Sequence, residues 1–394
     1  MLLAASLVMI MTPGLAFFYG GLVGRKNVLA IMIQSFVSMG WTTFIWWVCG
    51  YSLVFSGGNG AVIGNLDLAF LHGVNPTDII ASSGMPLLVL FVYQMMFAII
   101  TPALITGAFA NRIKFGAYMI FLTLWLIFVY FPIAHMVWGG GLFASWGVLD
   151  FAGGTAVHTT AGFAALASVL YVGRRAVKDK GPHSIPLVAL GTALLWFGWY
   201  GFNAGSELKV DSVTIIAFAN TDICASVAAI TWLFIAWWFE KKPKFLGLLT
   251  GAVAGLVAIT PAAGYVSIGG AVAIGVIVGF VCYLAVWFKN KMELDDALDV
   301  WGVHGIGGVV GCICTGIFAT KIWNPGGADG LLRGGTHFFW MQTLSVLITA
   351  AYAFAFSYVA LWLINKITRV KVSAEDEEEG LDSSLHGEEA YQGM

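Results

Sequence analysis

Long runs of apolar residues, separated by short polar connections, make up most of this chain. A run of about 20 residues is long enough for a helix to cross the roughly 30 Å hydrocarbon core of a bilayer. The pattern predicts eleven such spans, of which the eighth is short, over residues 2–23, 28–54, 85–109, 115–138, 153–173, 185–204, 213–239, 245–262, 269–288, 300–319 and 338–364. We therefore expect an all-α polytopic membrane protein, with a transmembrane domain over 1–366 and a polar tail over 367–394.

The composition agrees with a membrane protein and argues against a soluble enzyme. Of the 394 residues, 59% are hydrophobic and 10% are charged, whereas soluble domains carry about 25% charged residues. No basic patch with interleaved aromatic residues indicates a nucleic-acid partner. The five cysteines all fall within apolar runs and lack metal-ligand spacing, so we expect them to pack as small apolar residues, with no metal site and no cofactor.

Lysine and arginine are unequally distributed over the connections. One set of alternate connections, together with the tail, carries Arg25, Lys26, Arg112, Lys114, Arg174, Arg175, Lys178, Lys180, Lys241, Lys242, Lys244, Lys289, Lys291, Lys366, Arg369 and Lys371. The opposite set carries only Lys209, Lys321 and Arg333. Because positive residues favour the cytoplasmic side, the pattern predicts an outside N-terminus and a cytoplasmic C-terminus. It also supports an odd number of spans.

Two histidines lie inside apolar runs, each eight residues after an aspartate: His158 after Asp150, and His304 after Asp296. Eight residues of helix rise roughly 12 Å, so a helix that begins at each aspartate brings its histidine near the middle of the bilayer. Ionisable groups within a membrane are costly and are read first as functional. The residues alone leave three interpretations open: a hydrogen-bonded core pair, ligands of a metal or haem, and a pair on a path through the membrane.

The two histidine frames fall in the fifth and tenth predicted spans. Five helices per unit is an odd number, so the second unit enters the membrane from the opposite face, as in transporters built from inverted repeats. We therefore expect two inverted five-helix repeats, with the eleventh helix outside them. The glycine-rich face of span ten (Gly302, Gly305, Gly307, Gly308 and Gly311) is expected to allow close packing that brings His304 near His158.

The tail is strongly acidic over 375–379. Two interpretations stay open: a solvated, partly disordered end, and a regulatory segment that meets a cytoplasmic partner. Asp222, within span seven, has no evident role and is interpreted either as buried and neutral or as a subunit contact.

Several motifs together carry a resemblance. They are Tyr93-Gln-Met-Met-Phe97 in span three, His135-Met-Val-Trp138 at the end of span four, DFAGGTAVHTTAG over 150–162, GFNAGS over 201–206 and LDVWGVHGIGG over 298–308. With these strings in order, the chain resembles the ammonium transporter (Amt/Mep/Rh) family over nearly all of 1–373. One departure is Tyr93, where the family often has phenylalanine.

The resemblance implies roles for particular residues. It implies an outer cation site made by Phe97, Trp138 and Ser206 with Tyr93 nearby, and a gate of Phe97 stacked on Phe202. It makes His158 and His304 the pore pair, with Asp150, Asp299 and Trp199 in support. Asp150 is also expected to cap the helix that follows it, and His135 is expected to be structural.

The function implied is transport of ammonium or methylammonium, carried as ammonia with a separately relayed proton. The family also implies a homotrimer in membrane lipid and a PII-type signal protein at the cytoplasmic face, contacting the tail and the connection 289–299. Two other functions are kept: an ammonium sensor that binds without useful flux, and a haem or metal redox protein that uses the histidines.

Overall fold

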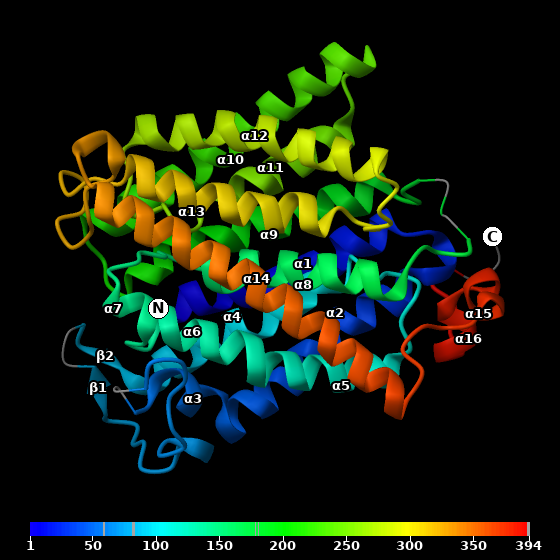
Figure 1. The fold of residues 1–394 in the computed structure, drawn as a ribbon, viewed down its shortest axis with the longest axis horizontal. Helices are drawn as coiled ribbons and strands as arrows, with labels where there is room; N and C mark the ends of the chain where they lie inside the picture. The colour runs from blue at the N-terminus through cyan, green and yellow to red at the C-terminus, as the bar shows by residue number, and fades with distance from the viewer. Residues whose placement is uncertain (58–59, 81–82, 178, 180, 392–394) are drawn as a thin grey trace.

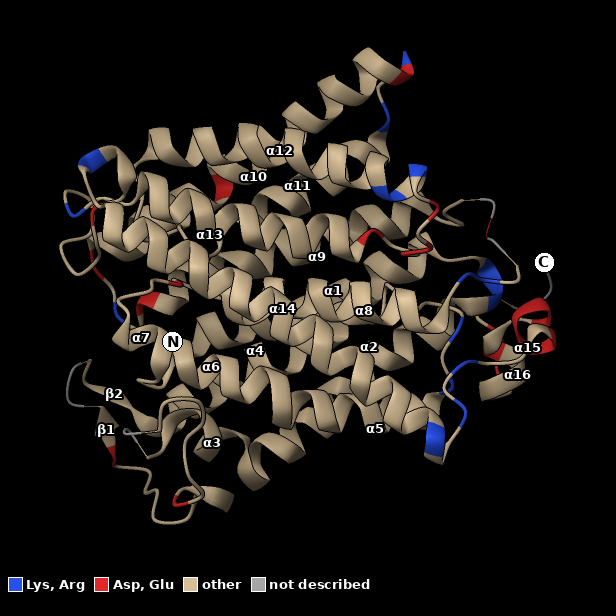
Figure 2. Cartoon of the chain, viewed as in Figure 1, with Lys and Arg blue, Asp and Glu red and all other residues tan. Residues whose placement is uncertain are grey.

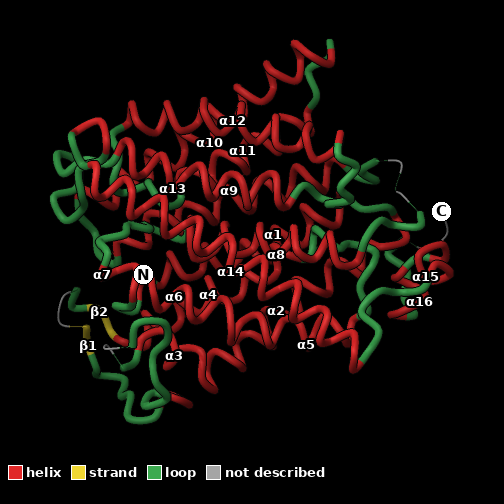
Figure 3. Tube along the Cα trace, in the orientation of Figure 1, coloured by secondary structure: helices red, strands yellow, loops and turns green. Residues whose placement is uncertain are grey.

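The computed structural model describes residues 1–57, 60–80, 83–177, 179 and 181–391. Long helices lie side by side, and the loops collect at the two ends of the bundle (Figures 1 and 3). Within the described part, ten helical segments are long and apolar enough to cross a membrane, and one shorter apolar helix, α11, accompanies them. The protein is therefore a multi-pass membrane protein built from helices.

The helices begin and end close to the predicted spans. Their bounds are α1 Leu2–Leu22, α2 Val28–Ile45, α3 Tyr51–Phe55, α4 Leu87–Ile105, α5 Phe115–Trp125, α6 Phe131–Trp138, α7 Leu142–Ser145, α8 Thr160–Val172, α9 Ile185–Ala204, α10 Ser212–Glu240, α11 Phe245–Ile259, α12 Ile268–Lys291, α13 Ile306–Phe318, α14 Thr336–Ile367, α15 Ala374–Glu379 and α16 Leu381–His386. Two short antiparallel strands, β1 (Ile79–Ile80) and β2 (Met85–Pro86), lie in the connection before α4.

Two of the spans end as buried turns rather than as full helices. Helix α4 is followed by the turns over 106–112, and α11 is followed by the turns over 260–265; nearly all of these residues are buried. The early end of α11 explains why the eighth apolar run is short. The turn after α11 holds the chain just before His158, because the carbonyl oxygens of Thr260 and Pro261 accept hydrogen bonds from the backbone N–H groups of Ala152 and Phe151.

Both histidines lie in π-helical segments, which corrects one expectation. The segment Gly154–Thr159 leads into α8, and the segment Trp301–Gly305 leads into α13. The π-helical segments begin four residues after Asp150 and five residues after Asp296. The eight residues of regular helix that we expected between each aspartate and its histidine are therefore not present. Short π-helical stretches inside α-helices often occur at functional sites. Other π-helical stretches join α2 to α3 (Trp46–Gly50) and α5 to α6 (Leu126–Tyr130).

The helical stretch that carries His158 and continues as α8, and the one that carries His304 and continues as α13, are called the two histidine helices. Their backbones are in direct contact at one point. A Cβ atom placed on Gly162 of α8 would collide with the backbone of Gly305 at the start of α13. A Cβ atom on Gly308 would come 2.9 Å from the backbone nitrogen of Thr159. Of the five glycines in span ten, Gly305 and Gly308 thus pack against the other histidine helix, and this contact sets the distance between the two imidazoles. The other three face elsewhere, since Gly302 meets Val286 of α12 while Gly307 and Gly311 meet Val257 and Ala258 of α11.

The tail is folded against the molecule, so the solvated, disordered interpretation is wrong for residues 370–386. The Asp382 carboxylate accepts a hydrogen bond from the backbone N–H of Ala30 (2.8 Å), and Asn27 accepts one from the N–H of Leu381 (2.9 Å). The Glu377 carboxylate accepts another from the N–H of Ala176 (2.6 Å). The tail therefore covers two connections, the one between α1 and α2 and the one between α8 and α9.

Charged residues lie mainly at the ends of the bundle, and lysine and arginine concentrate at the end that carries the C-terminus (Figure 2). Lys178 and Lys180 lie outside the described residues. Arg112 is an exception among the cations because it is fully buried. Its guanidinium lies 3.7 Å from the Asp295 carboxylate, which Arg175 also contacts at 2.7 Å. Arg112 is thus part of a buried ion-pair cluster rather than a surface charge.

Replacing Asp295 with asparagine should destabilise the protein by about 3 kcal/mol at neutral pH, because two cations, one of them fully buried, lose their counter-charge. Burial alone raises the pKa of Asp295, but the hydrogen bonds from Arg175 and the charge of Arg112 lower that pKa to about 2. A folded-state pKa below the unfolded value gives stability that is present above roughly pH 4 and is lost as pH falls toward about 2. Thermal unfolding in detergent at about pH 7, 5 and 3 measures this.

Glu293→Gln is the matched control, because the pair between Arg174 and Glu293 is exposed on both sides. This control should change stability by less than about 1 kcal/mol. Equal melting temperatures for Asp295→Asn and the parent protein at neutral pH would contradict the assignment.

Candidate functional site: a passage with a cavity at each end

A cavity of about 560 Å³, called the outer cavity after the predicted outer cation site, opens at the end of the bundle that carries the N-terminus. Its lining includes Phe97, Trp138 and Ser206, the three residues predicted for the outer cation site. Tyr93 lies beside them, fully buried, with its hydroxyl 3.2 Å from Ser206 Oγ. The structure therefore brings the predicted outer residues together from α4, from α6 and from the turn that follows α9.

The hydrogen bonds at Ser206 and Tyr93 leave acceptor capacity free. The Tyr93 hydroxyl lies 2.8 Å from the carbonyl oxygen of Gly201, to which it donates. The Ser206 hydroxyl donates to the carbonyl oxygen of Phe202 at 2.8 Å. Because a hydroxyl oxygen carries two lone pairs, Ser206 can still accept an N–H from a molecule in the cavity.

Phe97 and Phe202 close the floor of this cavity. Their rings are stacked, with centroids 4.2 Å apart and an interplanar angle of 23°, and both side chains are 1% exposed. Phe97 lines the outer cavity, whereas Phe202 lines the next one inward. The pair therefore separates the two spaces, and it consists of the two residues for which the family resemblance implies a gate.

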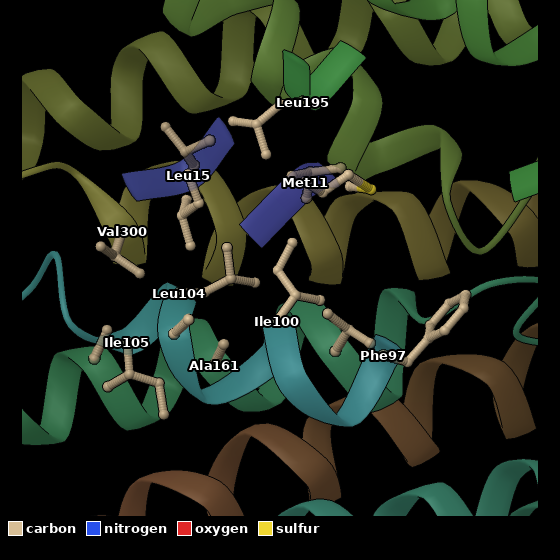
Figure 4. Close-up of a cluster of buried hydrophobic side chains, with 14 of the residues drawn as sticks. Met11, Leu15, Phe97, Ile100, Leu104, Ile105, Ala161, Leu195 and Val300 are labelled. Carbon is tan, nitrogen blue, oxygen red and sulfur yellow. The ribbon is translucent and has the colours of Figure 1, made fainter. Parts of the chain in front are cut away.

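The central cavity is narrow and apolar. It measures about 10 Å³, which is close to the space that one water-sized molecule needs. Its apolar lining includes side chains of α1, α4 and α9, namely Met11, Leu15, Ile100, Leu104 and Leu195. Figure 4 shows these five side chains within one buried cluster. The polar side chains in its lining are those of His158, His304 and Trp199. Such a space suits a small neutral molecule and disfavours an ion.

The two imidazoles lie against each other in this cavity. Nδ1 of His158 is 3.3 Å from Nδ1 of His304, and the ring centroids are 5.3 Å apart. Trp199, one of the predicted supporting residues, stacks on His158 at 5.3 Å and donates its indole N–H to Thr260. Among the described residues, Nε2 of His158 is buried without a hydrogen-bond partner.

This contact has a consequence for the protons of the pair. In a neutral pair, one Nδ1 must donate and the other must accept, so the two rings are opposite tautomers. One Nε2 is then an acceptor and the other is a donor. The pair offers one group of each kind to a molecule in the passage.

Asp150 holds the start of the first histidine helix. Its carboxylate, 5% exposed, accepts four backbone N–H bonds, from Gly153, Gly154, Thr155 and Ala156, at 2.7–3.1 Å. The Asp150 carbonyl oxygen also accepts the indole N–H of Trp138 at 2.9 Å. Asp150 therefore links the outer cavity to the histidine helix through its backbone and its side chain.

His135 sits one turn before Trp138 and anchors the outer connection. Its two ring nitrogens lie 2.7 Å from the carbonyl oxygen of Val54 and 2.8 Å from that of Gly60. The residue is fully buried and does not line the passage cavities, in agreement with the structural role expected of it.

An inner cavity of about 220 Å³ completes the series at the other end. It shares Phe18, Val253 and His304 with the central cavity, and Asp299 lies in its wall. Asp299 pairs with the buried Lys289 at 2.5 Å, while Asp296 accepts the backbone N–H of Val300 and Trp301. Asp299, one of the predicted supporting residues, thus lies in the wall of this cavity.

Sequence reasoning missed several lining residues. Phe18 and Val253 stand in unremarkable apolar runs, and no local signal marks them. Glu207 and Lys209 also line the outer cavity. Glu207 follows Ser206 directly and Lys209 comes three residues after it, so the closeness of these charges to the GFNAGS motif was a usable signal. Within the described residues, no group of three or more histidine, cysteine, aspartate or glutamate side chains could hold a metal ion.

A helical bundle that encloses an apolar passage, with a wider cavity at either end, defines a membrane protein with an internal route for a small solute. Comparison with known proteins identifies the class further. The model of the Ammonium Transporter Family matches residues 1–391. An ammonium transporter of Bacillus subtilis is 45% identical over 100% of this chain and 97% of that protein. The chain belongs to the ammonium transporter family.

Solved structures show the same fold. The crystal structure of Saccharomyces cerevisiae Mep2 matches with a TM-score of 0.88 at 35% identity, covering 95% of this chain and 86% of that one. A structure described as a sensor Amt protein matches with a TM-score of 0.88 at 29% identity, covering 96% of this chain and 95% of that one. The higher identity to ammonium transporters favours transport over sensing.

Proposed function

We propose that this protein moves ammonium across the plasma membrane through the passage described above, as a transporter and not as an enzyme. The observation that carries the proposal is the series of three cavities, in which stacked Phe97 and Phe202 separate the outer cavity from a narrow space that contains His158 and His304. Ammonium and methylammonium are the proposed substrates.

The outer cavity is proposed to bind the cation. The faces of Phe97 and Trp138 attract a cation by about 0.5–2 kcal/mol, and Ser206 adds an oriented acceptor. Potassium has no N–H to donate, so an oriented acceptor favours ammonium over potassium at similar size. Asp150 adds a negative charge behind the site without contacting the ion.

The central cavity is proposed to carry ammonia. Moving an unpaired charge into an apolar space costs many kcal/mol, whereas neutral ammonia avoids most of that cost. The two free imidazole positions, one donor and one acceptor, match the N–H groups and the lone pair of ammonia. The proton left at the outer site is proposed to pass separately along the pair, since each ring can take a proton on one nitrogen and release one from the other.

The architecture proposed is eleven spans in two inverted repeats, with α14 as the eleventh span. In support, each histidine lies in a π-helical segment that follows a capping aspartate and leads into a helix of 13 residues. Helices α4 and α11, five spans apart, both end in buried turns. We further propose an outside N-terminus and a cytoplasmic tail over 367–394, from the charge distribution in Figure 2.

The protein is proposed to assemble as a homotrimer, the state that the family resemblance implies. Asp222 supports an assembly, because it lies ten residues into α10 and is only partly buried. Its carboxylate accepts a hydrogen bond from Tyr200 at 2.6 Å. A carboxylate near the middle of the bilayer is costly when lipid surrounds it, and a neighbouring copy would remove it from lipid.

A PII-type signal protein is proposed to bind the cytoplasmic end. The tail and the connection 289–299 belong to one continuous surface, since Ala176 donates to Glu377 of the tail while Arg175 contacts Asp295. A partner that meets this surface also lies over the inner cavity.

An ammonium pulse applied to proteoliposomes on a solid support should evoke a saturable current that potassium does not evoke. Asp150→Ala should abolish the current, because the cap of the first histidine helix is lost. His158→Ala should stop the ammonium current or admit potassium, because the group that separates ammonia from its proton is gone.

Two outcomes would contradict the proposed mechanism. In the first, no current is seen but ammonia flux, measured through the pH inside the proteoliposomes, is intact; the protein would then be a neutral ammonia channel. Absence of both in folded protein would favour the sensor.

The mass of the purified protein in a native mass spectrum should correspond to three copies of the 42.2 kDa chain. Asp222→Arg should lower the trimer fraction, because it places a cation in the proposed interface. Leu347→Arg, on an exposed face of α14, is the matched control and should leave the trimer intact. A monomer or dimer of the parent protein would refute the assembly.

A purified PII-type protein should bind the intact transporter, and removal of the residues after Ser373 should lower the affinity by about tenfold or more, as loss of a principal contact does. Asp78→Asn, in the connection that carries β1, is the control at the opposite end of the bundle and should not change binding. Equal binding with and without the tail would contradict the proposed contact.

A further inference from the structure

The outer cavity contains an ion pair that the roles assigned so far do not use. After α9, the chain makes a 3₁₀ turn over Gly205–Glu207, and Leu208 then adopts left-handed backbone angles (φ +61°). A non-glycine residue in this region carries strain. The reversal directs the chain so that Glu207 and Lys209 both line the cavity together with Ser206.

The two partners of the ion pair are held very differently. Lys209 Nζ lies 3.3 Å from Glu207 Oε1 and 3.0 Å from Asp211 Oδ2. The Glu207 side chain is 14% exposed, whereas the Lys209 side chain is 54% exposed. Asp211 is fixed in place because it caps α10 through the N–H groups of Val213 and Thr214. Lys209 can therefore leave Glu207 and keep Asp211, while Glu207 stays at the cavity wall.

The charge balance favours a second cation. Two carboxylates share one ammonium group at this point, so the three side chains carry a net charge of about −1 when all are ionised. The two carboxylates raise the pKa of Lys209, which keeps it charged. A lysine head group and an ammonium ion have the same charge and the same kind of N–H donors. A carboxylate that accepts hydrogen bonds from the lysine head group can therefore also accept them from an ammonium ion.

We propose that Glu207 is an anionic part of the outer cation site, and that Lys209 is a tethered cation which an entering ammonium ion displaces from it. This inference rests on the proposed function, because it assigns a further residue to the same site. Glu207 raises the local concentration of cations beside Ser206 and the two aromatic rings. Lys209 opposes this effect, since an entering ion must compete with it. The pair therefore sets the apparent affinity, while the gate and the histidines set the rate of passage.

The experiment measures ammonium-evoked current against concentration for Glu207→Gln, Lys209→Gln and the double variant. Glu207→Gln should raise KM by about two- to five-fold, the range expected for one partly exposed charge pair. Lys209→Gln should lower KM by a similar factor, because Glu207 is left without its internal competitor. The double variant should behave as Glu207→Gln does. Maximal current should change less than KM in each case.

The matched control is Glu240→Gln, which removes one partner of the Glu240–Lys244 pair at the other end of α10. It should leave KM unchanged. The shift caused by Lys209→Gln should also shrink at high ionic strength, because exposed charges are screened by salt. A purely structural ion pair would lower the amount of folded protein without moving KM in opposite directions in the two single variants.

The outcomes separate this inference from the proposed function. If the parent protein carries ammonium current and neither single variant shifts KM, the role of Glu207 and Lys209 is overturned while transport stands. If Glu207→Gln does not fold, Lys209→Gln decides alone, because it keeps Glu207: a lowered KM supports the inference and an unchanged or raised KM overturns it. If the parent protein carries neither current nor ammonia flux, the proposed function fails first.

Discussion

Four backbone N–H groups at the start of the first histidine helix have no carbonyl partner within that helix, and the Asp150 carboxylate accepts a hydrogen bond from each of them. In a bilayer no water reaches such groups, and each one left unpaired costs several kcal/mol. A helix can begin inside the membrane only where another group replaces the missing carbonyls. Asp296 does the same with two bonds for the second histidine helix. The candidate passage depends on these caps, because they fix where each histidine helix starts.

The interrupted helices explain why the passage has its shape. Since the histidine helices begin within the bundle, the chain before each of them is free to form the wall of a wider cavity, with Trp138 and Phe151 at one end and Asp299 at the other. The contact at Gly162 and Gly305 then pulls the two helices together between these cavities. The wide ends and the narrow apolar centre thus have the same cause, a helix that begins within the bundle at an aspartate cap, and this arrangement occurs once for each histidine.

Hydropathy predicted the helices well, because a membrane-spanning helix needs a long apolar run wherever it lies. The Asp–His frames and the motif around Ser206 also indicated which side chains meet, and the structure brings them together. The π-helical segments at His158 and His304 could not be predicted, since their hydrogen bonds span five residues instead of four and this change leaves no mark in the apolar pattern. The tail was equally ambiguous, because its fold comes from hydrogen bonds to distant backbone groups such as that of Ala30. Glu207 and Lys209 were visible in the sequence, but only the reversal at Leu208 makes them neighbours in the cavity.

The contrast between the outer and central cavities limits how a charged solute can cross. The outer cavity is about 560 Å³ and has Glu207, Lys209 and the Ser206 hydroxyl in its wall, so a hydrated cation can exchange water for protein ligands there. The central cavity is about 10 Å³, and the described residues that line it include no carboxylate. An ion that entered it would lose its water and gain only two imidazoles, one of which already donates to the other. In the proposed mechanism the ion leaves a proton at the outer site, which removes the largest part of that cost. The two imidazoles in contact then have two proposed roles, as ligands for the neutral molecule and as the polar groups along which the proton follows.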